Sequence, residues 1–149
     1  MEVPCYKQEK EYSCAVCCLR MMLEFYGREY GEEELEKLCK TTEKGTIAKN
    51  VVDAAKRTGF LALLCEGDLE FIQVCVSSGM PVIVYLRTKS LPWWDYDAIH
   101  AVVVTGIDGN YVYINEPWLG SQVRCEVGDF VAAWNELSNL LIMIKPQKE

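Results

Sequence analysis

The chain has 149 residues, of which half are hydrophobic and a quarter are charged, with a net charge of −7 and a pI near 4.8. This acidic balance argues against nucleic acid as the main partner, because phosphate binding needs a cationic face. The length predicts a single domain over residues 1–149. No apolar run reaches transmembrane length, and the charged N-terminus lacks a signal core, so we predict a cytoplasmic location without membrane insertion.

Helices are predicted in the first part of the chain. The segment after Cys14 is apolar nearly all round, which predicts a central buried helix with Ser13 as its N-cap and Gly27 as its end. The next helix is acidic in its first turn. The third is expected to be capped by Thr46 and ended by Gly59, with Ile47, Val51 and Ala55 on one face. These two helices are predicted over Gly31–Lys40 and Thr46–Thr58.

The periodicity then changes to that of strands. Short apolar and β-branched runs predict five strands with two more helices among them. The strands are predicted over Phe60–Cys65, Pro81–Arg87, Ile99–Ile107, Tyr111–Asn115 and Leu140–Lys145, and the helices over Asp68–Ser78 and Asp129–Leu137. The third and fourth strands form a hairpin around Asp108–Asn110. Helices followed by a mostly antiparallel sheet indicate an α+β fold.

Eight cysteines are many for a chain of this length, and they lie at positions 5, 14, 17, 18, 39, 65, 75 and 125. Most sit inside apolar runs, and no export signal precedes them. This favours buried, reduced thiols over a disulfide framework. The Cys14-x-x-Cys17 spacing has no second pair to complete a zinc site, so we predict no metal and no cofactor.

The chemistry points to Cys14 and to the single histidine, His100. A thiol reacts as its thiolate, and the free N–H groups in the first turn of a helix stabilise that charge. Cys14 has this position, whereas Cys17 and Cys18 lie deeper in the same helix. His100 heads a strand, where its imidazole can face a cleft and act as the base for the thiol.

Two further groups complete a thiol hydrolase. Either Asn115 or Glu116 can orient His100, because the hairpin brings them close, and adjacent strand residues point to opposite faces, so only one can serve. Gln8 can donate its amide to an oxyanion together with the backbone N–H of Cys14. Each residue alone fits an ordinary structural role, and the order of the set carries the hypothesis.

The aromatic residues near His100 leave two interpretations open. Trp93 and Trp94 lie in a loop predicted over Ser90–Asp97, and Trp118 follows Glu116 in the sequence. They can form a substrate wall, or they can pack on the core or a partner chain.

The chain resembles the double-glycine leader peptidases, which are papain-like cysteine peptidase domains of bacteriocin exporters and their stand-alone relatives. The resemblance rests on short motifs spread over nearly the whole chain: Gln8, Cys14, Cys18-Leu19, Gly45-Thr46, His100 to Val103, Glu116-Pro117, Gly120, and Phe130 with Trp134. It implies a papain-like fold, with N-terminal helices packed on the sheet. It also implies Cys14 as nucleophile, His100 as base, Glu116 as the orienting group and Gln8 in the oxyanion hole.

The implied activity is cysteine endopeptidase cleavage through an acyl-enzyme. A peptide or protein would be the substrate, and an exporter or a precursor peptide would be the partner. Ser13 and Glu116 each replace an aspartate that is usual in the family, and Glu116 lengthens the arm by one methylene. This departure motivates an alternative, an inactive papain-like module that binds a peptide or a partner protein. A cysteine-rich metal or redox protein is a third interpretation.

Overall fold

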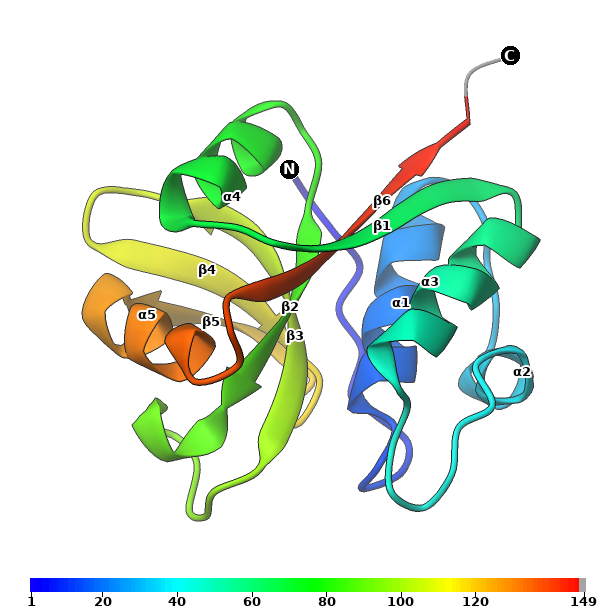
Figure 1. Ribbon diagram of the computed structural model, residues 1–149, viewed down its shortest axis with the longest axis horizontal. Coiled ribbons are helices and arrows are strands. Elements are labelled where there is room, and N and C mark those ends of the chain that lie inside the picture. The colour runs from blue at the N-terminus through cyan, green and yellow to red at the C-terminus, as the bar shows by residue number, and fades with distance from the viewer. Residues whose placement is uncertain (148–149) are drawn as a thin grey trace.

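The computed structural model describes residues 1–147 as a strongly twisted sheet with helices on both faces (Figure 1). The helices are α1 (Cys14–Phe25), α2 (Glu32–Leu38), α3 (Ala48–Arg57), α4 (Leu69–Ser77), the 3-10 turn η1 (Thr88–Ser90) and α5 (Val127–Asn135). The strands are β1 (Phe60–Glu66), β2 (Val82–Arg87), β3 (Ile99–Ile107), β4 (Tyr111–Glu116), β5 (Ser121–Glu126) and β6 (Leu140–Pro146). Their order in the sheet is β1-β6-β2-β3-β4-β5, and every neighbouring pair is antiparallel.

Two apolar cores cover the two faces of this sheet. Ile83 and Tyr85 of β2 pack with the core of α1–α3, whereas Val82, Val84 and Leu86 pack with α4 and α5. Successive strand residues point to opposite faces, so a strand that is buried on both sides must be apolar throughout. This accounts for the unbroken apolar run of β2 and fixes α1 against β3, where the site lies.

The α+β fold with N-terminal helices on an antiparallel sheet is confirmed, and the predicted helices and strands are all present. One strand was missed: β5, in which only Cys125 is buried, so it carries no apolar alternation. In the third helix, Val51 and Ala55 are buried as predicted, but the predicted Thr46 cap and the inward position of Ile47 are wrong. Ile47 stands at the N-cap of α3 and is 71% exposed, while the Thr46 hydroxyl pairs with Thr41.

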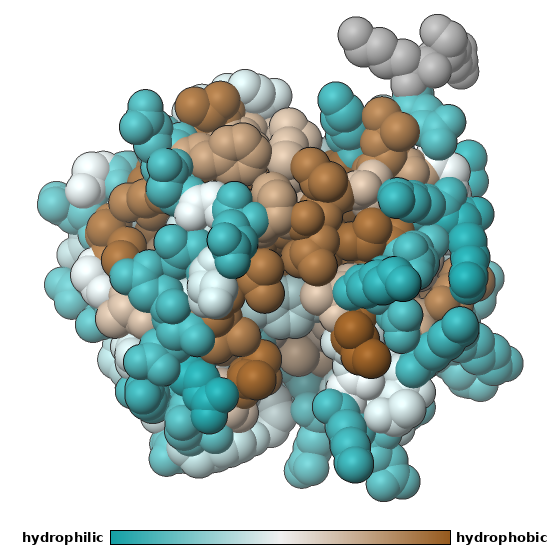
Figure 2. Space-filling model, in the orientation of Figure 1, coloured by the Kyte–Doolittle hydropathy of each residue, from teal (hydrophilic) through white to brown (hydrophobic). Residues whose placement is uncertain are grey.

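The surface is mostly polar, with apolar residues gathered over the middle of the face drawn in Figure 2, near the paired strands β1 and β6. Leu61 and Leu63 of β1 and Val74 of α4 are among the exposed apolar residues. Within residues 1–147, no helix combines the length and the apolar character needed to cross a membrane.

Candidate active site

Cys14 is the first residue of α1, as the sequence predicts. Burial by itself raises the pKa of this thiol, but the hydrogen bond and the charge of the His100 imidazole outweigh it and lower the pKa below its ordinary value. The backbone N–H groups of Ala101 and Ala15 act in the same direction. Hydrogen bonds to the charged form favour that form, so the site is built to hold a thiolate.

The other cysteines of α1 lack this help. Burial raises the pKa of Cys17 and Cys18 far above the ordinary value, and the neighbouring acidic groups add to the effect. The Cys17 thiol donates to the carbonyl of Tyr6 at 3.4 Å. All eight cysteines are free thiols in the structure. Cys14 is the one among them whose pKa is lowered.

His100 is the second residue of β3 and is 3% exposed. Burial lowers the pKa of an imidazole, but the contacts with Cys14 and Glu116 reverse this and raise the pKa of His100 to about 9. Its Nε2 atom contacts Oε1 of Glu116, which leaves Nδ1 as the ring nitrogen for the thiol. At neutral pH the ring is therefore a cation between the Cys14 sulfur and a carboxylate.

Glu116 is the last residue of β4 and is fully buried. Because Asn115 pairs with Val103 across the hairpin, Glu116 and His100 are diagonal neighbours on the same face of the sheet. Burial raises the pKa of this carboxyl, but His100 and the N–H donors around it bring the pKa below its ordinary value. Glu116 is thus an anion inside the fold.

Four donors surround the Glu116 carboxylate. Trp93 and Trp94 donate their indole N–H groups to Oε2 at 2.9 and 3.2 Å, and the backbone N–H of Trp118 donates to Oε1 at 2.9 Å. His100 is the fourth. From the sequence, these tryptophans were expected to form a substrate wall or to pack on the core or a partner chain. Their hydrogen bonds to the carboxylate were not predicted.

The Asn115 side chain lies on the opposite face of β4 from Glu116. Its amide donates to the backbone carbonyls of Val3 and Pro4 at 3.0 and 3.2 Å. The structure therefore brings Glu116 to the imidazole and uses Asn115 to bind the N-terminal arm, in agreement with the expectation that only one of the two can face His100.

Gln8 is buried, and its backbone N–H donates to the carbonyl of Pro117 at 2.8 Å, next to Glu116. Its side-chain amide donates to the carbonyls of Lys10 at 2.8 Å and Glu11 at 3.1 Å, in the loop that leads to Cys14. Its Oε1 atom is buried without a partner. The oxyanion role of Gln8 remains a prediction.

A groove of about 460 Å³ opens beside the thiol. Its lining is mostly apolar and comes from the start of α1, the loop before α3 and strands β2 and β3. The lining residues are Cys14, Ala15, Thr42, Lys44, Gly45, Thr46, Ile47, Tyr85, Ile99 and Ala101. The exposed Ile47 thus lies on the rim of this groove, which explains why it does not face the core.

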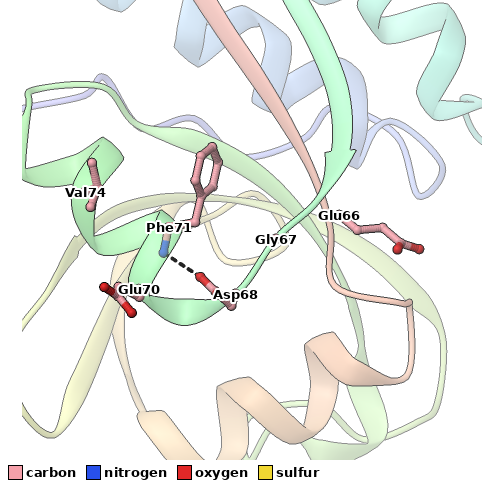
Figure 3. A pocket seen from close by; sticks show the side chains of 6 residues that line it. All are labelled: Glu66, Gly67, Asp68, Glu70, Phe71 and Val74. Carbon is pink, nitrogen blue, oxygen red and sulfur yellow. Dashed lines mark hydrogen bonds between the residues drawn. The ribbon is translucent and has the colours of Figure 1, made fainter.

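A second hollow, of about 550 Å³, lies at the start of α4 (Figure 3). Its lining combines the N-cap Asp68, which accepts from the backbone N–H of Phe71 at 2.7 Å, with the exposed Val74. Neither a thiol nor an imidazole lines it. We therefore assign the chemistry to the groove beside Cys14.

The fold is that of papain-like cysteine peptidases. The chain belongs to the Peptidase C39 family, whose model matches residues 2–149. A papain-like protease of Carica candamarcensis shares the fold at 13% identity, with a TM-score of 0.72 over 97% of this chain and 93% of that one.

Relatives within the family are similar over nearly the whole chain. The pediocin PA-1 transport/processing ATP-binding protein PedD of Pediococcus acidilactici is 28% identical over 95% of this chain. The chain spans only 19% of the length of PedD. The peptidase domain of Streptococcus ComA is 25% identical, with a TM-score of 0.81 over 98% of this chain and all of that one. A double-glycine motif protease from an AMS/PCAT transporter, solved with its leader peptide, is 24% identical, with a TM-score of 0.79 over 98% of this chain and 93% of that one.

Proposed function

We propose that this chain is an active cysteine peptidase that cleaves a peptide bond through a thioester acyl-enzyme. The observation that supports it is the opposed pair of pKa shifts, downward at Cys14 and upward at His100. Groups shifted in this way favour a thiolate next to an imidazolium, which is the reactive form of a thiol hydrolase. The contact between Glu116 and His100 favours an active site over an inactive module that only binds a peptide or a partner protein.

The reaction begins when Cys14 Sγ attacks the carbonyl carbon of the scissile bond. The oxyanion that forms accepts hydrogen bonds from the backbone N–H of Cys14 and from the side-chain amide of Gln8. An amide has two N–H groups, and both acceptors of the Gln8 amide are loop carbonyls, so Gln8 must release one of them to reach the oxyanion.

His100 then protonates the leaving amine as the C–N bond breaks, which leaves a thioester on Cys14. His100 next removes a proton from water, and the resulting hydroxide attacks the thioester, which frees the acid and restores the Cys14 thiolate beside the protonated imidazole. Glu116 holds the imidazole in the orientation that both proton transfers need.

A leader peptide that ends in two glycines is the substrate class we propose. The support is the groove beside Cys14, where Gly45 and Thr46 on one side and Tyr85 on another suit an extended chain with small side chains. The bound leader peptide of the AMS/PCAT protease supports the same class. We place the reaction in the cytoplasm, in one domain, with an exporter or its precursor peptide as the partner.

The test incubates the purified chain with a synthetic leader peptide that ends in Gly-Gly and identifies the products by mass spectrometry. We expect cleavage after the second glycine, and a loss of about tenfold or more when that glycine is replaced by valine. Cys14→Ala should abolish cleavage, whereas Cys65→Ala, in β1, should retain it. Equal cleavage by Cys14→Ala would overturn the mechanism.

A substrate-independent measurement separates an active site from an inactive module. At mildly acidic pH, iodoacetamide should alkylate Cys14 faster than any other cysteine, because only its pKa is lowered. Equal labelling of Cys14 and Cys65 would show that no activated thiolate exists and would leave the peptide-binding module as the remaining function.

A further inference from the structure

The loop before β3 is tied at both of its ends. The Thr88 hydroxyl donates to the carbonyl of Tyr96 and accepts from the backbone N–H of Ala98, both at 2.7 Å. Arg87 donates to both carboxylate oxygens of Asp97, at 3.0 and 3.2 Å. These bonds close the loop on itself, so the tryptophans at its tip are held in place rather than left to move.

The two indoles of this loop converge on one oxygen atom. The N–H groups of Trp93 and Trp94 both reach Oε2 of Glu116, which leaves Oε1 for His100 and for the backbone N–H of Trp118. An indole N–H is a donor only, and it bears no proton that titrates at these pH values. Both indoles therefore favour the carboxylate form of Glu116, because they can donate a hydrogen bond to it but cannot accept one from its protonated form.

The rings also shield the contact between imidazole and carboxylate. The Trp94 ring lies 4.7 Å from the His100 ring and stacks on Trp118 with centroids 4.9 Å apart. Tyr96 packs edge-on against Trp94 at 5.3 Å. Excluding water in this way strengthens the electrostatic interactions of the pair.

We propose that Trp93 and Trp94 are positioning residues of the catalytic pair, whose indole N–H groups fix Oε2 of Glu116 so that Oε1 stays on His100. This rests on the proposed roles of His100 and Glu116. The site accommodates a glutamate in this way because the additional methylene brings the carboxylate within reach of the indole N–H groups of Trp93 and Trp94.

This role is distinct from that of a substrate wall. Both indole N–H groups are already bonded to Glu116, and neither tryptophan lines the groove beside Cys14. The other titratable groups that act on Glu116 and His100 are thiols of the N-terminal arm and α1, namely Cys5, Cys14 and Cys18. Burial raises the pKa of Cys5 and Cys18, so both stay neutral at acidic pH, where the proposal is tested.

The first test uses the indole N–H signals in a nitrogen-edited NMR spectrum. The chain has four tryptophans, so four signals are expected, and single Trp→Phe variants assign them. Glu116→Gln removes the charge that Trp93 and Trp94 face, and we expect both of their signals to move. The signal of Trp134, which donates to the carbonyl of Leu140 at 2.8 Å, should stay in place and serves as the control.

The second test measures the protonation of Glu116 through the chain's single histidine. The His100 ring signals of the untagged protein should show a low-pH inflection when Glu116 takes up a proton. Removing both donors in the Trp93→Phe/Trp94→Phe variant should raise that inflection by about one pH unit. Trp134→Phe, which loses a core tryptophan, should leave it unchanged, so a general loss of packing is distinguished from a loss of donors.

Neither measurement involves turnover, so the outcome does not depend on finding a substrate. Indole signals that do not respond to Glu116→Gln, or a double variant with the native inflection, would overturn the positioning role of Trp93 and Trp94. A native protein that passes both tests but fails to label selectively at Cys14 would instead overturn the proposed function.

Discussion

Asn115 and Glu116 are adjacent on β4, and their side chains point to opposite faces of the strand. Asn115 donates to the carbonyls of Val3 and Pro4, whereas Glu116 contacts His100. The end of β4 thus contacts both the N-terminal arm and the imidazole. Since Gln8 belongs to the same arm and its backbone N–H donates to the carbonyl of Pro117, the hairpin also holds the segment that carries Gln8.

Glu116→Gln should lower the pKa of His100 from about 9 toward the 6.5 of an ordinary imidazole. The carboxylate stabilises the imidazolium, so without its negative charge the neutral ring is favoured at a lower pH. We expect a fall of about one unit or more, because Cys14 still raises the pKa in the variant. NMR titration of the single histidine measures it directly.

The control for this variant is Glu70→Gln, which removes an exposed carboxylate of α4 and should leave the titration unchanged. If Glu116→Gln titrates like the native protein, the carboxylate does not govern His100, and the orienting role assigned to Glu116 fails.

Glu116→Asp should reduce the cleavage rate, although aspartate is the usual residue of the family that this chain resembles. Because its arm is one methylene shorter, the aspartate carboxylate should not reach both His100 and the indoles of Trp93 and Trp94. A displacement of about 1 Å in a catalytic constellation can cost about a hundredfold in rate. We therefore expect kcat/KM to fall by about ten- to a hundredfold in an assay with the leader peptide.

The matched control is Glu126→Asp at the exposed end of the neighbouring strand β5, which should cleave at the native rate. Native activity in Glu116→Asp would show that the additional methylene has no function in this site.

Much of this site could be predicted from the sequence because it depends on local patterns. The apolar run after Cys14 determines a helix whose first turn presents the thiol, and the hairpin brings Glu116 diagonal to His100. These relations follow from periodicity and from the short separation of two paired strands.

The remaining features depend on contacts that no local pattern encodes. Trp93 meets Glu116 across 23 residues of sequence, and a tryptophan in a loop is equally typical of packing or of binding. The exposure of Ile47 depends on the groove that the loop before α3 forms with the start of α1 and strands β2 and β3. Propensity and spacing describe neighbours along the chain, and these residues are defined by neighbours in space.

Asn115→Ala should loosen the N-terminal arm. The variant removes two hydrogen bonds to backbone carbonyls, and a net loss of about 1–2 kcal/mol of stability is expected. Hydrogen exchange should accelerate at the backbone N–H of Gln8, whose bond to the carbonyl of Pro117 depends on the arm staying in place. The exposed Asn135 at the end of α5 supplies the control, Asn135→Ala. Unchanged exchange at Gln8 would show that the arm is held independently of Asn115.

Tyr85→Phe should stabilise the protein. Tyr85 is 7% exposed, and its hydroxyl is buried without a hydrogen-bond partner at the groove beside Cys14. Burying an unpaired polar group costs about 1–3 kcal/mol, so removing it should raise the free energy of unfolding by about 1 kcal/mol. For a chain of this length, that corresponds to a rise of about 3 °C in Tm.

The matched variant is Tyr26→Phe, because the Tyr26 hydroxyl donates to the carbonyl of Ile144 at 2.8 Å. The same deletion should there lower Tm by a similar amount, since it leaves a carbonyl unpaired. Calorimetry of the two variants under identical conditions should therefore give shifts of opposite sign. A fall in Tm for Tyr85→Phe as large as that for Tyr26→Phe would mean that the Tyr85 hydroxyl is bonded in solution, and the groove would then hold an ordered water next to the thiol.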